Sequence, residues 1–200
     1  MSLFFFTAPA TTEISTLSLH DALPISVDPI NDAPALDHLN GDDVAAVNNG
    51  NAVILDAAEA LDLSDPDSPA NFDGGFIQIT GTSFDALDSI GLDLSGTVSV
   101  SAGFADGSTV SVGGVAIGTL AGVTNDTATL NLNTDSTLAR VETLLQSITF
   151  DSTATVFGSR TVDITLNDGD GTANGGTDAV ASSISVNLAS SANGTVSTNE

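Results

Sequence analysis

Hydrophobic and polar residues alternate along most of the chain after residue 35. In a β-strand such alternation puts every second side chain on the same face, which gives one apolar and one polar face. The alternating segments are GFIQIT (75–80), GTVSVS (96–101), TATLNLN (127–133), RTVDITLND (160–168) and SSISVNL (182–188). Strands with one dry face are typical of two packed antiparallel sheets, so we predict an all-β, antiparallel β-sandwich.

The alternation also predicts which side chains form the core. The segment STVSVGGVAI (108–117) predicts two short strands joined at Gly113-Gly114, since paired glycines tolerate the positive φ of a tight hairpin. The expected inward-facing residues are Ile77, Ile79, Val98, Val100, Ala128, Leu130, Leu132, Val162, Ile164, Leu166, Ile184, Val186 and Leu188.

One segment has helical periodicity instead. Its apolar residues recur every three or four positions, which makes one stripe along a helix from about 136 to 147. The stripe consists of Leu138, Val141, Leu144, Leu145 and Ile148. Thr134, Asp135 or Ser136 is expected to cap this helix, and a strand should follow at 148–151. We expect the helix to close one end of the sandwich; binding a partner is the alternative.

The composition is strongly acidic, with a formal charge of −24 and no lysine. This charge excludes nucleic acid and anionic membrane surfaces as partners. The 41% of hydrophobic residues favours a folded core over disorder. Cysteine is absent, which excludes disulfides and thiol chemistry, and no apolar run is long enough for membrane insertion.

The chain divides into four parts by composition. Residues 1–26 differ from the remainder, and TTEISTLSLHDALPIS within them resembles the translation of a sequencing adapter. We interpret this segment as non-native; a native, unstructured N-terminal tail is the alternative. Residues 27–34 are predicted to be an inter-domain linker, 35–189 one β-sandwich domain and 190–200 a flexible tail.

The linker VDPINDAP (27–34) combines stiff backbone with oxygen-bearing side chains. Its two prolines fix φ and favour an extended chain. Asp28, Asn31 and Asp32 supply the hard oxygen ligands that Ca²⁺ prefers. The linker is therefore a candidate for a calcium-stiffened hinge, with a polar turn before the first strand as the alternative.

Two further acidic motifs are candidates for the same ion. Asp65 and Asp67 form a D-x-D pair beside Pro66, although a simple turn with capping character also fits. The loop NDGDGTANGGTD (167–178) contains Asp168 and Asp170, each followed by a glycine. It could form a second site or be a solvated hairpin loop.

The order of these motifs resembles the cadherin-like repeats, of immunoglobulin type, in large bacterial adhesins. TLNLNTDSTLARVETLLQSITF followed by RTVDITLNDGDG resembles the C-terminal half of such a repeat, and INDAP with DLSDPDSP the N-terminal half. The resemblance covers about 27–188. It implies a calcium-binding tandem repeat for cell adhesion, with Ca²⁺ held by Asn31, Asp32, Asp65 and Asp67. Asp28 matches less closely. In the fold that the resemblance implies, the end of the strand 160–168 would lie near the D-x-D turn, and Asp168 would then complete this site rather than form a second one.

The resemblance also sets expectations about location and partners. The repeat would be extracellular or on the bacterial cell surface. Its partners would be neighbouring repeats of the same polypeptide and a cell-surface or matrix ligand. We do not expect an enzyme, because the histidine outside the N-terminal segment, His38, is isolated and predicted to be on the surface. A carbohydrate-binding or accessory module of a secreted enzyme is the alternative, although Trp and Tyr are absent.

Overall fold

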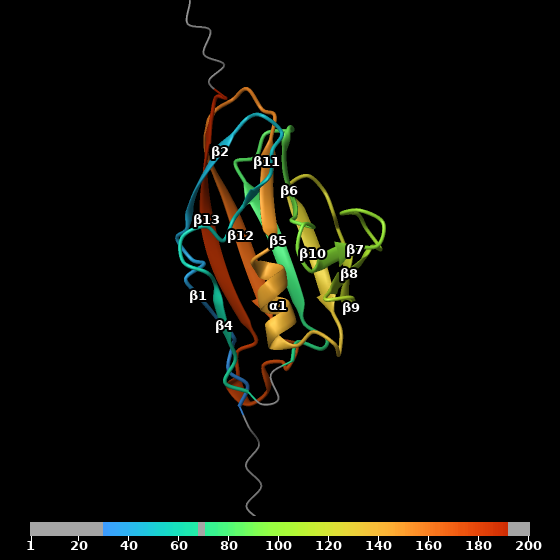
Figure 1. The fold of residues 1–200 in the computed structure, drawn as a ribbon. Helices are drawn as coiled ribbons and strands as arrows, with labels where there is room; N and C mark the ends of the chain where they lie inside the picture. The colour runs from blue at the N-terminus through green and yellow to red at the C-terminus, as the bar shows by residue number, and fades with distance from the viewer. Residues whose placement is uncertain (1–29, 68–70, 192–200) are drawn as a thin grey trace, which may run out of the picture.

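The computed structural model describes residues 30–67 and 71–191, and they form a β-sandwich with one short α-helix. The large sheet has eight strands in the spatial order β2 (Asp43–Val47), β13 (Ala179–Ala189), β12 (Gly158–Asn167), β5 (Phe76–Thr82), β10 (Thr127–Leu132), β9 (Val115–Ala121), β8 (Thr109–Val112) and β7 (Val98–Val100) (Figure 1). The predicted all-β sandwich is therefore confirmed.

The second layer covers one face of this sheet and consists of smaller pieces (Figure 1). A three-stranded sheet has the order β3 (Val53–Ile54), β11 (Ile148–Ser152) and β6 (Asp88–Leu92), and a two-stranded sheet pairs β1 (Ala35–Asp37) with β4 (Asp62–Ser64). The helix α1 (Leu138–Leu145) lies in the same layer. A 3-10 turn at Ala173–Gly175 lies between β12 and β13.

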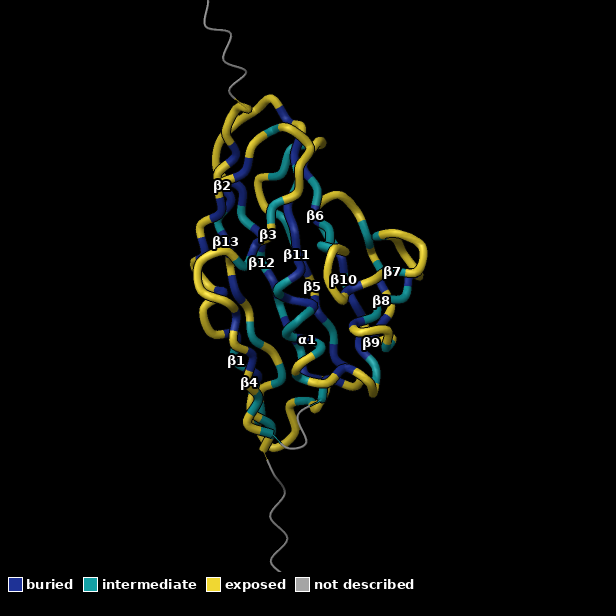
Figure 2. The backbone as a smooth tube through the Cα atoms, viewed as in Figure 1, coloured by how far each residue is buried: buried dark blue, intermediate teal, exposed yellow. Residues whose placement is uncertain are grey.

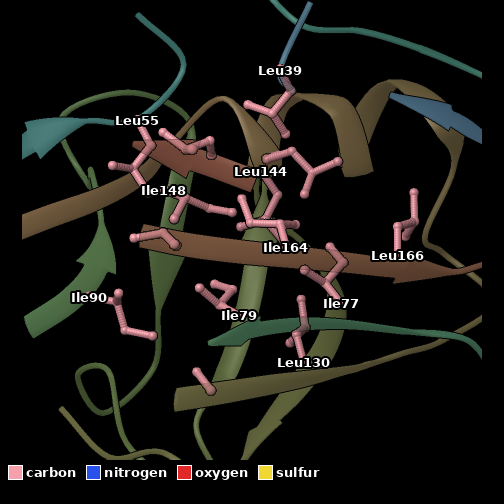
Figure 3. Packing of buried hydrophobic residues seen from close by; sticks show 14 of the residues in the cluster. Leu39, Leu55, Ile77, Ile79, Ile90, Leu130, Leu144, Ile148, Ile164 and Leu166 are labelled. Carbon is pink, nitrogen blue, oxygen red and sulfur yellow. The ribbon is translucent and has the colours of Figure 1, made fainter. Parts of the chain in front are cut away.

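The core between the layers is built from the residues that alternation predicted. All of the expected inward side chains are buried except Val100, which is half-buried and packs against the core. Figure 2 shows this alternation of buried and exposed residues along the strands. In Figure 3, Ile77, Ile79, Ile164 and Leu130 of the large sheet lie opposite Ile148 and Leu144 of the second layer.

The register explains how distant parts of the chain meet. The predicted hairpin forms, with Val112 opposite Val115 and both turn glycines at positive φ. The long hairpin of β12 and β13 and the pairing of β12 with β5 are antiparallel. β2 pairs with β13 in parallel, which alternation alone did not predict because it does not encode strand direction.

The helix differs from the expectation in its bounds, its cap and its place. It begins at Leu138, and the N-cap is Thr137, without a side-chain cap hydrogen bond. Thr134, Asp135 and Ser136 were therefore wrong as caps. The Ser136 hydroxyl donates instead to the buried carbonyl of Ile117 at 2.5 Å. The helix lies on the face of the large sheet, where it takes the place of strands in the second layer and does not close an end (Figure 1).

The ends of the described chain lie at opposite ends of an elongated molecule (Figure 1). We call the end near Ile30 the N-terminal end and the end near Ser191 the C-terminal end. β5 runs from Phe76, opposite Asn167, at the N-terminal end to Thr82, opposite Thr161, toward the C-terminal end. The predicted segment 1–26, the start of the linker and most of the predicted tail lie outside the described residues.

Candidate functional site

Three separate parts of the sequence meet at the N-terminal end of the sandwich. They are the linker residues 31–34, the turn at 65–67 after β4, and the loop 167–178 between β12 and β13. Direct hydrogen bonds join the linker to both of the other segments. We call these three segments together the acidic end. Asp28 lies outside the described residues.

The linker is fastened to the 167–178 loop through Asn31. Its side-chain amide donates to both carboxylate oxygens of Asp168, at 3.3 and 3.1 Å, and to the Thr177 carbonyl at 2.8 Å. The Asn31 carbonyl accepts a hydrogen bond of 3.0 Å from the Thr177 N–H. The N–H of Ala33 donates to the Thr177 hydroxyl at 3.2 Å. The side chain and the backbone of Asn31 and the backbone of Ala33 therefore all join the linker to the loop.

The turn at 65–67 contacts the linker from the other direction. The backbone N–H of Asp32 donates to Asp67 Oδ2 at 2.8 Å, and the N–H of Asp67 donates to Asp65 Oδ1 at 2.9 Å. The second contact is an Asx turn within a loop, so the residues form a turn and cap no helix. The remaining oxygen of Asp65, Oδ2, is buried and has no hydrogen-bond partner among residues 30–67 and 71–191. A buried carboxylate oxygen without a partner carries a desolvation cost.

Close backbone contacts fix the position of Asp168. A side chain on Gly169, where φ is +89°, would place its Cβ 2.4 Å from the Asp73 carbonyl oxygen. A Cβ on Gly75 would lie 2.1 Å from the carbonyl oxygen of Asn167. Glycine at both positions lets the loop reach the start of β5. Asp168 is fully buried there, and its Oδ1 accepts the Asp170 N–H at 2.9 Å.

Burial and mutual repulsion raise the pKa of two carboxyl groups at the acidic end. For Asp65, burial raises the pKa most, and the negative charges of Asp168, Asp67 and Asp170 add to it, although the Asp67 N–H acts in the opposite direction. For Asp168, burial again raises the pKa most; hydrogen bonds from Asp170 and Asn31 offset part of this, and repulsion from Asp170 and Asp178 adds to it.

No positive side chain neutralises these carboxylates among the described contacts. Arg140 donates to the carbonyl of Asp135, and Arg160 forms an ion pair with Asp88 near the other end. Within the described residues, no positive charge therefore compensates the negative charge of the acidic end.

The acidic end offers hard oxygen donors but no ready-made metal site among the described residues. Within residues 30–67 and 71–191, no three His, Cys, Asp or Glu side chains are grouped closely enough to hold a metal ion in this arrangement. The chemistry of the donors nevertheless fits a hard cation, because they are carboxylate and amide oxygens and one of them, Asp65 Oδ2, is buried and unpaired. The segments that meet are those the sequence singled out, with Asp170 at the exposed rim.

Asp168 lies against the linker, which is the arrangement expected if it completes a site with Asp65 and Asp67. Sequence reasoning had left open a separate second site in the loop. Thr177, which fastens the linker, was missed because a threonine in a glycine-rich loop has no distinguishing pattern. Glu59, which is near the D-x-D pair in sequence, has its Oε2 3.9 Å from His38 Nε2. His38 is exposed, as predicted.

A second polar cluster, near the C-terminal end, was not predicted. Arg160 Nε donates to Asp88 Oδ2 at 2.6 Å, and both side chains are almost completely buried. The Ser152 hydroxyl donates to the other carboxylate oxygen, also at 2.6 Å, and a second Arg160 nitrogen donates to the Val156 carbonyl. Burial acts to raise the pKa of Asp88, but hydrogen bonds from Ser152, Arg160 and the Asp85 N–H, together with the positive charge of Arg160, outweigh it and lower the pKa. The pair joins the first residue of β6 to the start of β12.

Comparisons with known proteins give no match: no family model fits the chain, and no curated protein or solved structure is significantly similar to it. Among the described residues, no helix is both long enough and apolar enough to cross a membrane.

Proposed function

We propose that this chain is a calcium-binding structural repeat of an exported bacterial adhesion protein, and that Ca²⁺ at the acidic end stiffens the junction with the preceding domain. One observation carries the proposal. Three segments far apart in sequence bring Asp32, Asp67, Asp65 and Asp168 to the same end, where Asp65 Oδ2 is buried without a partner among the described residues.

Calcium suits this end better than other common metals. The described candidates include neither sulfur nor imidazole groups, and zinc and copper sites usually contain them. Mg²⁺ requires near-ideal octahedral geometry, whereas Ca²⁺ accepts six to eight oxygens in flexible arrangements. Asp65, Asp67 and Asp168 would hold the ion, with the side-chain oxygen of Asn31 and with Asp32 and Asp170 at the rim.

Binding would act on the linker through contacts that already exist. The carboxylates repel one another without a cation, and a divalent ion would offset that repulsion and draw the segments together. Because Asn31 and Asp32 belong to the linker and bond directly to Asp168 and Asp67, an ion at these carboxylates restrains the linker.

The shape of the domain fits a role in a tandem array. The described chain enters at one end of the elongated sandwich and leaves at the other, so successive domains would follow one another in line (Figure 1). The role is structural and not catalytic. The partners are neighbouring repeats and a cell-surface or matrix ligand, and the location is extracellular.

Thermal unfolding of the full chain in calcium and in chelator tests the proposal. The Asp65→Asn, Asp67→Asn variant removes two charges but keeps oxygen acceptors for the Asp67 and Asp32 N–H groups. Asp85→Asn, Asp126→Asn is the matched control. Asp85 follows the end of β5 and Asp126 precedes β10, so both lie at the end of these strands away from the acidic end. Calcium should raise the melting temperature of the wild type and the control only. Equal melting curves with and without calcium in the wild type would overturn the proposal.

A further inference from the structure

The described chain contains three Asn-Gly pairs, which differ in how the fold holds them. They are Asn40-Gly41, Asn49-Gly50 and Asn174-Gly175; a fourth, Asn193-Gly194, lies outside the described residues. Asn-Gly pairs are prone to deamidation, since glycine has no Cβ to keep its backbone nitrogen away from the asparagine side chain. The reaction requires both groups to be free to approach each other.

Two of the pairs are held by hydrogen bonds at both reacting groups. Asn40 Oδ1 accepts the N–H of Ser183 at 3.0 Å, and the Gly41 N–H donates to the carbonyl of the same residue at 2.9 Å. Asn49 Oδ1 accepts from the N–H of Asn51 at 3.0 Å, and the Gly50 N–H donates to the Ser152 carbonyl at 3.2 Å. Attack at either pair must first break these bonds.

The third pair is held by no hydrogen bond to another part of the fold. Asn174 is exposed, and its side chain makes no hydrogen bond within the described part of the chain. The N–H of Gly175 lies inside the short 3-10 turn and bonds to no described segment outside it. Asn174 also has φ +57°, in the left-handed region that non-glycine residues seldom adopt. The surrounding 3-10 turn is closed by the N–H of Gly176, which donates to the Ala173 carbonyl at 3.1 Å.

We propose that Asn174 is a site of spontaneous deamidation in the folded protein. The Gly175 backbone nitrogen loses its proton and attacks Asn174 Cγ, a C–N bond forms, and the side-chain nitrogen leaves as ammonia. Water then opens the cyclic imide at one of its two carbonyl carbons. The products are an aspartate or an isoaspartate at position 174, and no oxidant or cofactor is needed.

The product places a new carboxylate in the loop that carries Asp168 and Asp170. The isoaspartate also lengthens the backbone three residues before Thr177, which holds the linker through Asn31. The modification therefore changes the charge and the backbone of the acidic end with time. This inference does not depend on calcium binding.

The test is peptide mapping by mass spectrometry after incubation of the full chain at mildly alkaline pH, folded and in denaturant. The conversion of each Asn-Gly pair is followed, and its folded rate is divided by its unfolded rate. Asn40 and Asn49 are internal controls. The Asn174→Gln variant lacks the Asn-Gly pair at this position, so the peptide signal that it loses comes from deamidation of Asn174. Since two hydrogen bonds protect each control pair, folding should slow them roughly ten-fold or more.

We expect folding to slow deamidation at Asn174 much less than deamidation at Asn40 and Asn49. The folded protein should therefore accumulate its deamidated form at Asn174 before either control. The inference is overturned if folding protects Asn174 as strongly as the controls, or if Asn40 or Asn49 converts first in the folded protein.

Discussion

The backbone N–H of Asp32 donates a hydrogen bond of 2.8 Å to the carboxylate of Asp67, across 35 positions of sequence. This contact makes the conformation of the linker depend on the position of an acidic side chain in the domain. On the other side of the linker, Asn31 makes the same kind of contact with the buried carboxylate of Asp168. Whatever acts on these carboxylates therefore acts on the linker.

The raised pKa of Asp65 predicts a particular pH dependence without cations. A carboxyl group whose pKa is higher in the folded than in the unfolded state contributes stability below its ordinary pKa, and that stability is lost as the pH rises through the folded value. In chelator, the free energy of unfolding should therefore fall from acidic to neutral pH more steeply in the wild type than in Asp65→Asn. Denaturant titrations across this range measure both slopes, and parallel profiles would contradict the prediction.

The close approach at Gly169 predicts an asymmetry between two glycines of the same loop. Gly169 and Gly171 both have positive φ, but a Cβ at Gly171 meets nothing within 4 Å, whereas one at Gly169 meets the Asp73 carbonyl. Gly171→Ala should cost about 1–2 kcal/mol for the left-handed backbone. Gly169→Ala should cost roughly 1–3 kcal/mol more because backbone must move. Urea unfolding of both variants checks this, and equal costs would show that the loop does not press on the start of β5.

Removing Arg160 should be among the most damaging single substitutions. Arg160→Met leaves the fully buried Asp88 carboxylate without its cation, which costs about 3–5 kcal/mol in comparable buried pairs. Adding Asp88→Asn should recover part of the lost stability, since the buried carboxylate left without a positive partner is then replaced by a neutral amide. Arg140→Met is the control and should cost less than about 1 kcal/mol, because Arg140 is only partly buried. Equal losses for the two arginines would contradict the buried network.

The packing of the second layer predicts a contrast between two phenylalanines. Phe150 is fully buried in β11 and meets the ring of Phe84 edge-on, with 5.4 Å between ring centroids. Phe150→Ala should cost about 3–5 kcal/mol. Phe157, which is 47% exposed, should change stability by no more than about 0.5 kcal/mol when replaced by alanine. Denaturant unfolding of both variants separates a core residue from a surface residue.

The strands could be predicted from sequence because each one buries every second side chain. Val162, Ile164 and Leu166 alternate with polar residues and are all fully buried. The helix cap could not be predicted with the same success. Ser136 is an ordinary cap residue by type, but the carbonyl of Ile117 takes its hydroxyl through a tertiary contact that local sequence does not reveal.

The candidate site could be predicted in its parts but not in its connections. Asp65, Asp67 and Asp168 could be identified because each is an aspartate beside a turn-forming proline or glycine, and such motifs are seldom part of a hydrophobic core. The hydrogen bonds from Asn31 to Asp168 and from Asp32 to Asp67 depend on the fold, which alone sets how close the loops come. The buried pair of Arg160 and Asp88 was missed, although an arginine at the start of an apolar strand was a visible signal.

Calorimetric titration of the full chain with calcium tests the central claim most directly. We predict saturable binding in the wild type and in Asp85→Asn, Asp126→Asn, and its loss in Asp65→Asn, Asp67→Asn. Binding that survives in the last variant would move the ion to the 167–178 loop and contradict the shared site with the linker. No binding at millimolar calcium would contradict the proposal that calcium stiffens this junction.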